Sequence, residues 1–291
     1  RYAAADLATP DHRARAIGTL VWASTFGSVL GPTIGFGPAK DFANFIGIHE
    51  LAGPHLFAAV LFTISALVVF FRLKPDPLVV AGGLGKDAAD RGLKEAAKSL
   101  FASPVGRLSV GSMVAGHWVM VGVMTMTPLH LKAGDHNLEI IGFVISLHII
   151  GMYAASPVVG WLTDRITAPP VMAMGGVILF IGAQMTANTP IHESDGIFWG
   201  LFLIGLGWSF GLVASSALLA VTFDGVDRVR VQGLADLSMT TAGALAGVSA
   251  GLVVAATSFE TLSNIASLVG LLPIFGFAAL MVSQRKARSA A

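Results

Sequence analysis

The chain has no cysteine among its 291 residues, and only 12% of the residues carry a charge. The lack of cysteine excludes disulfides, thiolate metal sites and cysteine nucleophiles within this sequence. Soluble domains contain about 25% charged residues, so half that charge together with 54% hydrophobic residues predicts an integral membrane protein. The formal net charge of +1, without a basic cluster interleaved with aromatics, gives no case for nucleic-acid binding.

Apolar segments long enough to cross a bilayer, which takes about 20 residues, recur eight times along the chain. We therefore predict an all-α integral membrane protein with eight transmembrane helices. The chain begins at Arg1, without a Met or a leading apolar run, and we expect it to be a fragment whose natural N-terminus is missing. The predicted spans are Ile17–Phe36, Pro54–Phe71, Val105–Leu129, Ile140–Leu162, Pro170–Ala187, Gly196–Thr222, Val231–Ala256 and Leu262–Val282.

The basic residues are divided unequally between the two sides that these spans define. Of the 18 Lys and Arg residues, all except Lys40 and Lys132 fall on the same side as the N-terminal segment. Because loops rich in Lys and Arg stay in the cytoplasm, we expect both chain ends, including the C-terminus, to be cytoplasmic. The predicted location is the cell membrane.

The longest segment between predicted spans divides the chain into two spans and six spans. Within it, the spacing of apolar residues predicts an amphipathic helix on the cytoplasmic face, after a GGLG stretch that breaks regular structure. Its apolar positions are Leu93, Ala96, Ala97, Leu100 and Phe101. We expect three regions: residues 1–71 with two spans, the linker 72–104, and residues 105–291 with six spans.

The first span carries a stripe of glycines in the stretch GTLVWASTFGSVLGPTIG. Gly27, Gly31 and Gly35 recur every four residues and share one face of a helix, and Gly18 lies nine residues before Gly27. In lipid such a face lets a second helix backbone approach closely. Pro32 is expected to bend the helix.

The sequence resembles the major facilitator superfamily in two motifs. The glycine stripe is similar to the motif of drug/proton antiporters, a Gly, eight residues and then G-x-x-x-G-P-x-x-G, with Phe36 where a second Gly is usual. The segment GWLTDR is similar to the start of the superfamily's loop motif G-x-L-x-D-R-x-G-R, although Thr167 and its neighbours replace the later Gly and basic residues. The matching positions of this second motif are Gly160, Leu162, Asp164 and Arg165.

The resemblance implies twelve spans in two six-span halves that rock around a central site. The eight spans here would be spans five to twelve, and Arg1–Ala5 the end of the fourth. Spans seven and ten would line the cavity, and spans five and eight would meet at the seam between the halves. We expect the glycine stripe to pack there against a small-residue face formed by Gly151, Ala155 and Ser156.

Two titratable residues within predicted spans are candidates for carrying a coupling proton. Asp236 lies about a turn and a half into the seventh predicted span, and an acid within a membrane is a functional candidate. The alternative is a position at the cytoplasmic interface, where Asp236 would pair with Arg228 or Arg230 or cap the helix. His148 lies in the middle of a span and can exchange a proton near neutral pH. Its alternative is a neutral imidazole that bonds to a neighbouring helix.

The third predicted span carries a stripe of soft side chains, Met113, His117, Met120 and Met124. Three interpretations remain open: plain helix packing, the lining of an adaptable binding cavity, and a site for a soft metal such as copper. Four such groups on one helix cannot all reach one ion, so we predict no metal site. Trp208 and Ser216, on a span that the resemblance places at the cavity, are further substrate candidates.

The sequence favours a secondary transporter that exports small organic compounds in exchange for protons. Its expected partners are a small-molecule substrate, protons and the lipid bilayer, with no cofactor, and we expect a monomer. The alternatives are a facilitator or importer of a small metabolite, and a membrane sensor that transports nothing. An intramembrane enzyme would need a catalytic pair, for which Asp236 with His148 is the candidate; we predict no enzyme.

Overall fold

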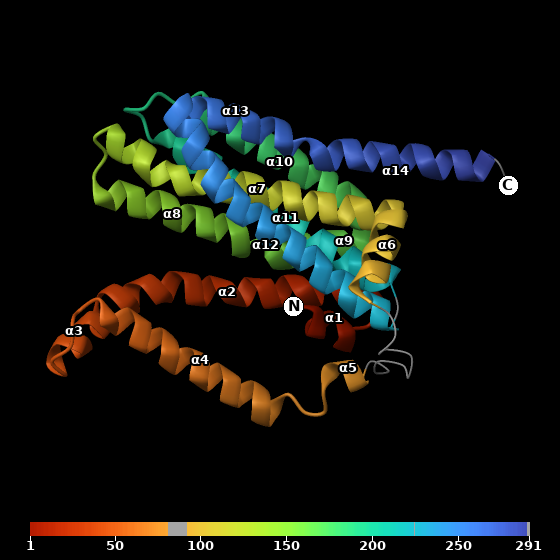
Figure 1. Cartoon of the computed structure of the whole chain (residues 1–291), viewed down its shortest axis with the longest axis horizontal. Coiled ribbons are helices and arrows are strands. Elements are labelled where there is room, and N and C mark those ends of the chain that lie inside the picture. The colour runs from red at the N-terminus through yellow and green to blue at the C-terminus, as the bar shows by residue number, and fades with distance from the viewer. Residues whose placement is uncertain (81–91, 224, 290–291) are drawn as a thin grey trace.

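The computed structural model describes residues 1–80, 92–223 and 225–289. Within these ranges the chain forms helices joined by short connections, with no strand (Figure 1). The first helices are α1 (Tyr2–Leu7), the 3-10 helix η1 (Pro10–His12), α2 (Arg13–Phe36), α3 (Pro38–Phe45), α4 (Ala52–Arg72) and α5 (Pro77–Val80). Then follow α6 (Leu93–Ala102), α7 (Pro104–Ala133), α8 (Leu138–Tyr153), α9 (Ser156–Ile166), α10 (Ala168–Ala187), α11 (Asp195–Thr222), α12 (Gly225–Ala256), α13 (Phe259–Gly270) and α14 (Leu272–Ser289).

Seven helical segments in the described part of the chain are long and apolar enough to cross a membrane. They correspond to seven of the eight predicted spans. The predicted span Ile17–Phe36 is not one of the seven, although α2 is helical over its whole length and, with 24 residues, long enough to cross. The all-α membrane fold is therefore confirmed, and the first span is present as a helix.

Two predicted spans are each broken into two helices, which is a correction to the sequence analysis. The span Ile140–Leu162 is α8 followed by α9, with a break at Ala154 and Ala155. Pro157 stands at the start of α9 and has no N–H to continue the helix. Ser156 Oγ donates to the Tyr153 carbonyl at 2.7 Å, which satisfies an acceptor left at the break. Pro273 likewise follows the break between α13 and α14.

Helices α7 to α14 pack into one body around α11. Helix α11 lies against α10 with glycines on both sides of the contact, so that an added Cβ at Gly207 would lie 2.8 Å from the Gly175 carbonyl oxygen. At Gly182, an added Cβ would lie 2.7 Å from the carbonyl oxygen of Gly200. Small residues therefore bring these helices close, as is usual within membranes.

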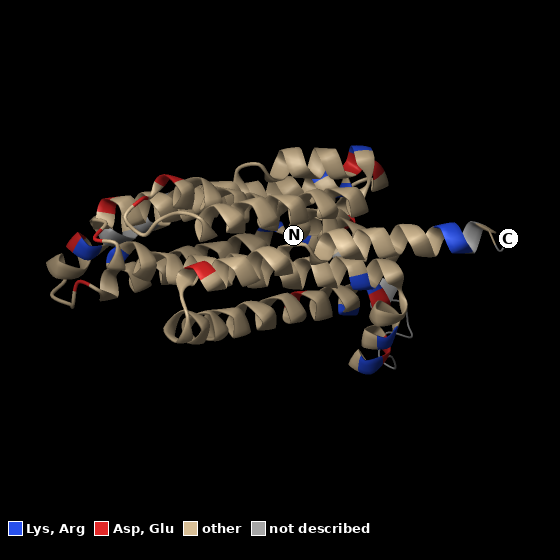
Figure 2. Cartoon of the chain, turned by 90° about the horizontal axis from the view of Figure 1, so that it is seen from above, with Lys and Arg blue, Asp and Glu red and all other residues tan. Residues whose placement is uncertain are grey.

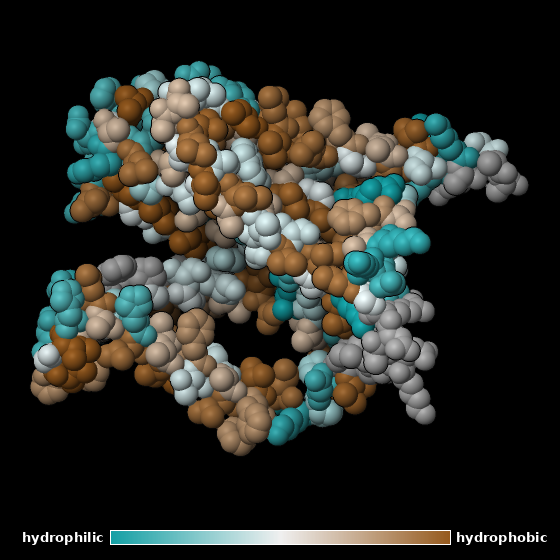
Figure 3. All heavy atoms as spheres, viewed as in Figure 1, coloured by the Kyte–Doolittle hydropathy of each residue, from teal (hydrophilic) through white to brown (hydrophobic). Residues whose placement is uncertain are grey.

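Helix α4 stands away from this body. Its apolar membrane-length segment is 0% buried, and Figure 3 shows an open gap between it and the rest of the chain. Large side chains along it, including Phe62, Phe70 and Phe71, are exposed. Helices α2, α3 and α4 therefore form a separate arm that meets the body through α2 (Figure 1).

Charged residues gather toward the two ends of the helices (Figure 2). We call the end where α2, α7 and α12 begin and α9 and α14 finish the basic end, and the other the opposite end. The basic end carries Arg13, Arg107, Arg165, Arg228 and Lys286. The opposite end carries Lys40, Glu50, Lys132, Asp135 and Glu139.

The predicted amphipathic helix of the linker forms as α6, at the basic end. Ala96 and Leu100 are buried, because α6 packs on α12 and α7, while Leu93 and Phe101 are exposed. The glycine-rich stretch predicted before it lies mostly within residues 81–91, outside the described residues. The division into 1–71, 72–104 and 105–291 stays a prediction.

Candidate functional site

The glycine stripe of α2 meets the other helices near the basic end. A Cβ added at Gly18 would lie 2.3 Å from the Ser156 carbonyl oxygen and 3.4 Å from the Gly160 Cα. A Cβ added at Gly160 would lie 2.5 Å from the Ala14 carbonyl oxygen. The two motifs therefore contact each other, and α9, which belongs to the predicted partner span, packs on α2 as expected.

Asp164 completes this contact by binding the start of α2. Its two carboxylate oxygens accept hydrogen bonds from the backbone N–H groups of Ala14 and Arg15, each at 3.1 Å. Helix α2 has no side-chain cap of its own at His12. A carboxylate at this position satisfies free N–H groups and complements the helix dipole. Arg165 points elsewhere, with its guanidinium carbon 5.5 Å from the centre of the Trp161 ring.

The part of the stripe from Gly27 onward does not make the close contact that the sequence analysis expected. A Cβ added at Gly27 or Gly31 would meet nothing within 4 Å. Gly151, an expected partner, instead approaches α11, where its Cβ would lie 2.3 Å from the Phe202 carbonyl oxygen. Pro32 and Gly35 lie within α2, but the predictions about their contacts fall outside what the structure describes.

The N-terminal residues bind α11 and α12 at the basic end. The Arg1 guanidinium forms an ion pair with Asp236 and donates to Ser216 Oγ at 2.9 Å. The Tyr2 hydroxyl lies 3.4 Å from the same Asp236 carboxylate oxygen. Asp236 therefore joins α12 to the α1 segment, and Ser216, which is fully buried, takes part in this contact.

A second ion pair lies beside the first. Arg228 of α12 pairs with Asp6 of α1 at 3.0 Å, and each side chain is only 11% exposed. Arg228, which the sequence analysis considered as a partner of Asp236, therefore pairs with Asp6 instead. Truncating either member of a half-buried pair leaves a charge without its partner, which is costly.

A cavity of about 290 Å³ lies between α2, α7 and α8. Its lining includes Met120 and Met124, two of the predicted substrate residues, and Ser28, the residue after Gly27. Across from them lie Met152 and Tyr153 at the end of α8. The described lining carries no charged side chain, and its other residues are Val121, Thr125 and Ile149.

His117 and Trp208 are brought together behind this cavity. The Trp208 indole N–H donates to His117 Nδ1 at 2.9 Å. The Trp208 ring also meets the Tyr153 ring edge-on, with centroids 6.0 Å apart. The hydrogen bond holds the Trp208 indole in place. The indole in turn supports the Tyr153 ring, which lines the cavity beside the thioethers.

His148 is fully buried and lies apart from Asp236. Its Nδ1 lies 2.7 Å from the Leu201 carbonyl oxygen, so the bond joins α8 to α11. This contact matches the alternative of an imidazole bonded to a neighbouring helix. Asp236 is instead paired with Arg1, so the two residues share no described contact.

Sequence reasoning missed Tyr153, Ser28 and Asp6. Tyr153 could have been found from its position three residues before Ser156 and four before Pro157, since a helix break within a span exposes side chains to a cavity. Asp6 is one of two acids, with Asp11, in the N-terminal segment that also carries three arginines, and such a mixture of charges allows local ion pairs. Ser28 carries no signal other than its place beside Gly27.

The sequence is similar to a family of known proteins. Residues 131–291 match the profile described as Major Facilitator Superfamily. The uncharacterized MFS-type transporters YdeG and YddS of Bacillus subtilis are 35% and 32% identical, each over 94% of this chain and 64% of its own length. The riboflavin transporter RfnT of Brucella anthropi is 27% identical over 90% of this chain and 63% of its own length.

The chain thus spans a little under two thirds of the length of these relatives. Its relatives are named as transporters rather than as enzymes. The chain belongs to the Major Facilitator Superfamily of multi-pass membrane proteins.

Proposed function

We propose that the protein is a secondary transporter that exports small organic molecules in exchange for protons by alternating access. The observation that carries the proposal is the distribution of contacts along α2. At the basic end α1 and α2 bind the body through two ion pairs and the Asp164 cap. Beyond Gly18, α2 borders the cavity at Ser28 and has open space at Gly27 and Gly31.

This arrangement is the one expected of a transporter closed at the basic end. The excess of Lys and Arg there favours a cytoplasmic location. The described conformation then corresponds to an outward-facing state, with both chain ends in the cytoplasm. In the inward-facing state, α2 would separate from α9 at the basic end and close over the cavity near Gly27 and Gly31.

Asp236 is the candidate for the coupling group. Its negative charge stabilises the closed basic end by pairing with Arg1. Protonation would remove this charge, weaken the closed state and favour opening toward the cytoplasm. A proton taken up in the outward-facing state would therefore be released inside, which is the direction that an exporter needs. His148 is the second candidate, but its imidazole is buried and its Nδ1 is engaged with Leu201.

The cavity favours an uncharged aromatic substrate. Its described lining offers thioethers of Met120, Met124 and Met152 together with the Tyr153 ring, and no charge to pair with an ionic ligand. Thioethers and aromatic rings attract each other with about 0.3–1.5 kcal/mol per contact. The relative named as a riboflavin transporter supports this class, because riboflavin is an uncharged molecule with a planar ring system.

The proposal is tested with the full-length protein in liposomes that contain a pH-sensitive dye. We expect transport of riboflavin, or of a similar uncharged aromatic compound, to move protons in the opposite direction. Asp236→Asn should abolish the response to a pH gradient, whereas the matched change Asp135→Asn at the opposite end should leave it intact. Transport that ignores the gradient in wild type and in Asp236→Asn would favour a facilitator and would refute proton coupling.

Substrate binding is measured separately, by quenching of ligand fluorescence in detergent. Tyr153→Ala should weaken binding about tenfold, and Tyr153→Phe should retain most of it, since the ring supplies the contact (about 1.4 kcal/mol per factor of ten). Equal binding by wild type and Tyr153→Ala would remove this cavity as the substrate site without touching the coupling argument.

A further inference from the structure

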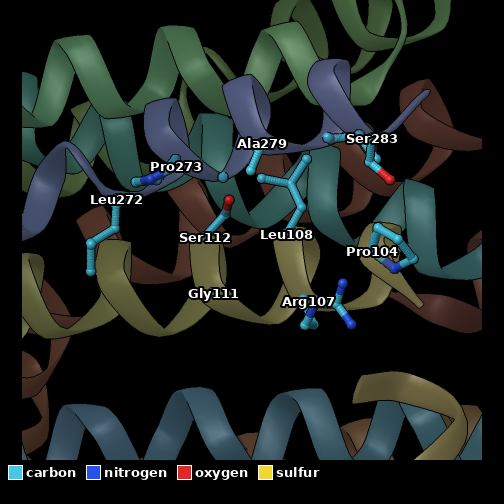
Figure 4. A pocket seen from close by; sticks show the side chains of 11 residues that line it. Pro104, Arg107, Leu108, Gly111, Ser112, Leu272, Pro273, Ala279 and Ser283 are labelled. Atoms are coloured by element: carbon cyan, nitrogen blue, oxygen red, sulfur yellow. The ribbon is translucent and has the colours of Figure 1, made fainter. Parts of the chain in front are cut away.

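A second cavity, of about 340 Å³, lies in a groove between α7 and α14. Figure 4 shows Leu272 at one end of the groove and Ser283 and Pro104 at the other. Phe275 and Val282 on α14 are exposed beside it, so the groove opens onto apolar surface. In a multi-pass membrane protein this is surface that faces lipid. The groove shares α7 with the cavity at Tyr153, but the two have no lining residue in common.

The groove exists because glycines replace side chains where the two helices face each other. A Cβ added at Gly276 would lie 2.9 Å from Leu108 Cδ1, so this glycine lets Leu108 pack beneath α14. A Cβ added at Gly111 would meet nothing within 4 Å, and Gly111 lines the groove. The space beside Gly111 is therefore open volume that a ligand can fill.

Ser112 gives the groove an unsatisfied polar group. The residue is 1% exposed, and its Oγ has no hydrogen-bond partner among the described residues. Figure 4 shows the hydroxyl pointing from α7 toward α14, into the groove. Ser109, one turn earlier on α7, is also buried without a described partner, but it does not line the groove. A hydroxyl left without a partner at membrane depth is unfavourable, and an acceptor bound in the groove would satisfy it.

Positive charge is concentrated where the groove reaches the basic end. Arg107 lines the groove, and its Nη1 donates to the Phe101 and Ala102 carbonyl oxygens at 2.6 and 3.3 Å. It forms no ion pair with a described carboxylate. Arg285 and Lys286 follow Ser283 on α14 and are also exposed and without a described acidic partner. Of the two α14 cations, Lys286 follows Ser283 by three residues and lies on the groove side of the helix, so an anionic group at this end would meet Arg107 and Lys286.

We propose that this groove binds one anionic phospholipid of the leaflet at the basic end. The phosphate binds Arg107 and Lys286, since basic sites between membrane helices bind anionic headgroups. Ser112 lies five residues further along α7, or about 7.5 Å at about 1.5 Å per residue. This depth suits donation from its hydroxyl to an ester carbonyl of the glycerol backbone. One acyl chain then lies along Gly111 toward Leu272.

The lipid would hold α14 against α7, which starts directly after the linker helix α6. The same Arg107 that faces the phosphate binds the last carbonyls of α6. The bound lipid thereby connects the membrane leaflet to the linker helix. This proposal is independent of the substrate and of proton coupling, since it uses none of the residues at the central cavity or at Asp236.

The test is native mass spectrometry of the full-length protein in detergent, with phosphatidylglycerol and phosphatidylcholine of identical acyl chains. We expect one phosphatidylglycerol to be retained at least tenfold more strongly than phosphatidylcholine. Gly111→Leu should fill the groove and reduce retention about tenfold. Its control is Gly142→Leu on α8, where an added Cβ also meets nothing within 4 Å. Lys286→Gln should weaken the preference for phosphatidylglycerol, while Lys132→Gln at the opposite end should not.

The hydroxyl provides a second measurement that does not depend on filling the groove. Wild type should bind ester-linked phosphatidylglycerol more tightly than its ether-linked analogue, which lacks the carbonyls. Ser112→Ala, which removes only the unsatisfied hydroxyl, should abolish this difference. Equal retention of both headgroups, or undiminished retention in Gly111→Leu, would overturn the proposal. A preference for esters that persists in Ser112→Ala would overturn the role of the hydroxyl.

Discussion

The two ends of helix α2 differ in what surrounds them, although one glycine motif runs through both. At Gly18 the helix backbone lies against Ser156 and Gly160, with no room for a single added carbon. At Gly27 and Gly31 an added Cβ would meet nothing within 4 Å, and the neighbouring Ser28 lines the cavity.

In the alternating-access proposal, the two ends of the motif serve as contact surfaces in two different conformations. Contacts at Gly18 are formed in the described state, and the free glycines near Gly27 are available for the other state. Packed helices tend to have discrete alternative arrangements rather than a continuous range. Substitutions at each end of α2 test this proposal, and they follow in order of decreasing effect on the stability of the protein.

Gly18→Leu should have the largest effect. Its Cβ would lie 2.3 Å from a backbone oxygen that cannot move without shifting α9. We expect a loss of about 3 kcal/mol or more, at the upper end of the range for overpacking, measured as a fall in the thermal melting temperature of purified protein. A variant that melts with wild type would show that α2 and α9 are not in contact in the protein's resting state.

Asp164→Ala should have the next largest effect. It removes the acceptor for the N–H groups of Ala14 and Arg15 at the start of α2. Loss of a helix cap costs about 1 kcal/mol and loss of a favourable charge about 0.3–1 kcal/mol. The melting temperature should fall, and Asp164→Asn, which keeps one acceptor oxygen, should recover part of it. No recovery would argue that charge alone matters.

Thr167→Gly should have a smaller effect of opposite sign. Thr167 has φ 72° and ψ 162°, a conformation that is open almost solely to glycine. It stands where the loop motif of the family carries a glycine. Relief of strain of about 1–3 kcal/mol, less the entropic cost of about 0.5–1 kcal/mol for glycine, should raise the melting temperature. A lower melting temperature would contradict this account of the turn.

Gly27→Leu should have the smallest effect on stability and a large effect on transport. The described state has room for the side chain, so the free energy of unfolding should change by no more than about 0.5 kcal/mol. Transport should fall because α2 can no longer close over the cavity, while substrate binding in detergent is retained. Equal loss of binding and transport would indicate that the glycine lines the binding site instead.

Much of the fold follows from the sequence because lipid imposes helices on long apolar segments. The helical spans were predicted in this way. The linker helix was predicted from its amphipathic spacing, and the packing of α2 on the span that contains α9 was expected from the family resemblance. The break between α8 and α9 was not, since the apolar pattern continues through Pro157 and hydropathy alone does not register a missing N–H.

The candidate site was harder to predict. Met120 and Met124 share a helix face by their spacing and line the cavity, and their role in substrate binding stays a prediction. The partner of Asp236 was not found, because Arg1 is separated from it by more than two hundred residues and no local pattern links them. Nor could the sequence distinguish the filled half of the glycine stripe from the open half, since both have the same residue types.

The proposal that protonation of Asp236 opens the basic end and closes the opposite end is tested most directly by two distances between spin labels in the full-length protein. One pair, Leu7 and Val221, lies at the basic end, and the other, Phe42 and Leu138, lies at the opposite end; all four side chains are exposed. In wild type, lowering the pH should lengthen the distance at the basic end and shorten the distance at the opposite end. Asp236→Asn should show the same shift already at neutral pH. Distances that stay fixed, or that change in the same direction at both ends, would contradict it.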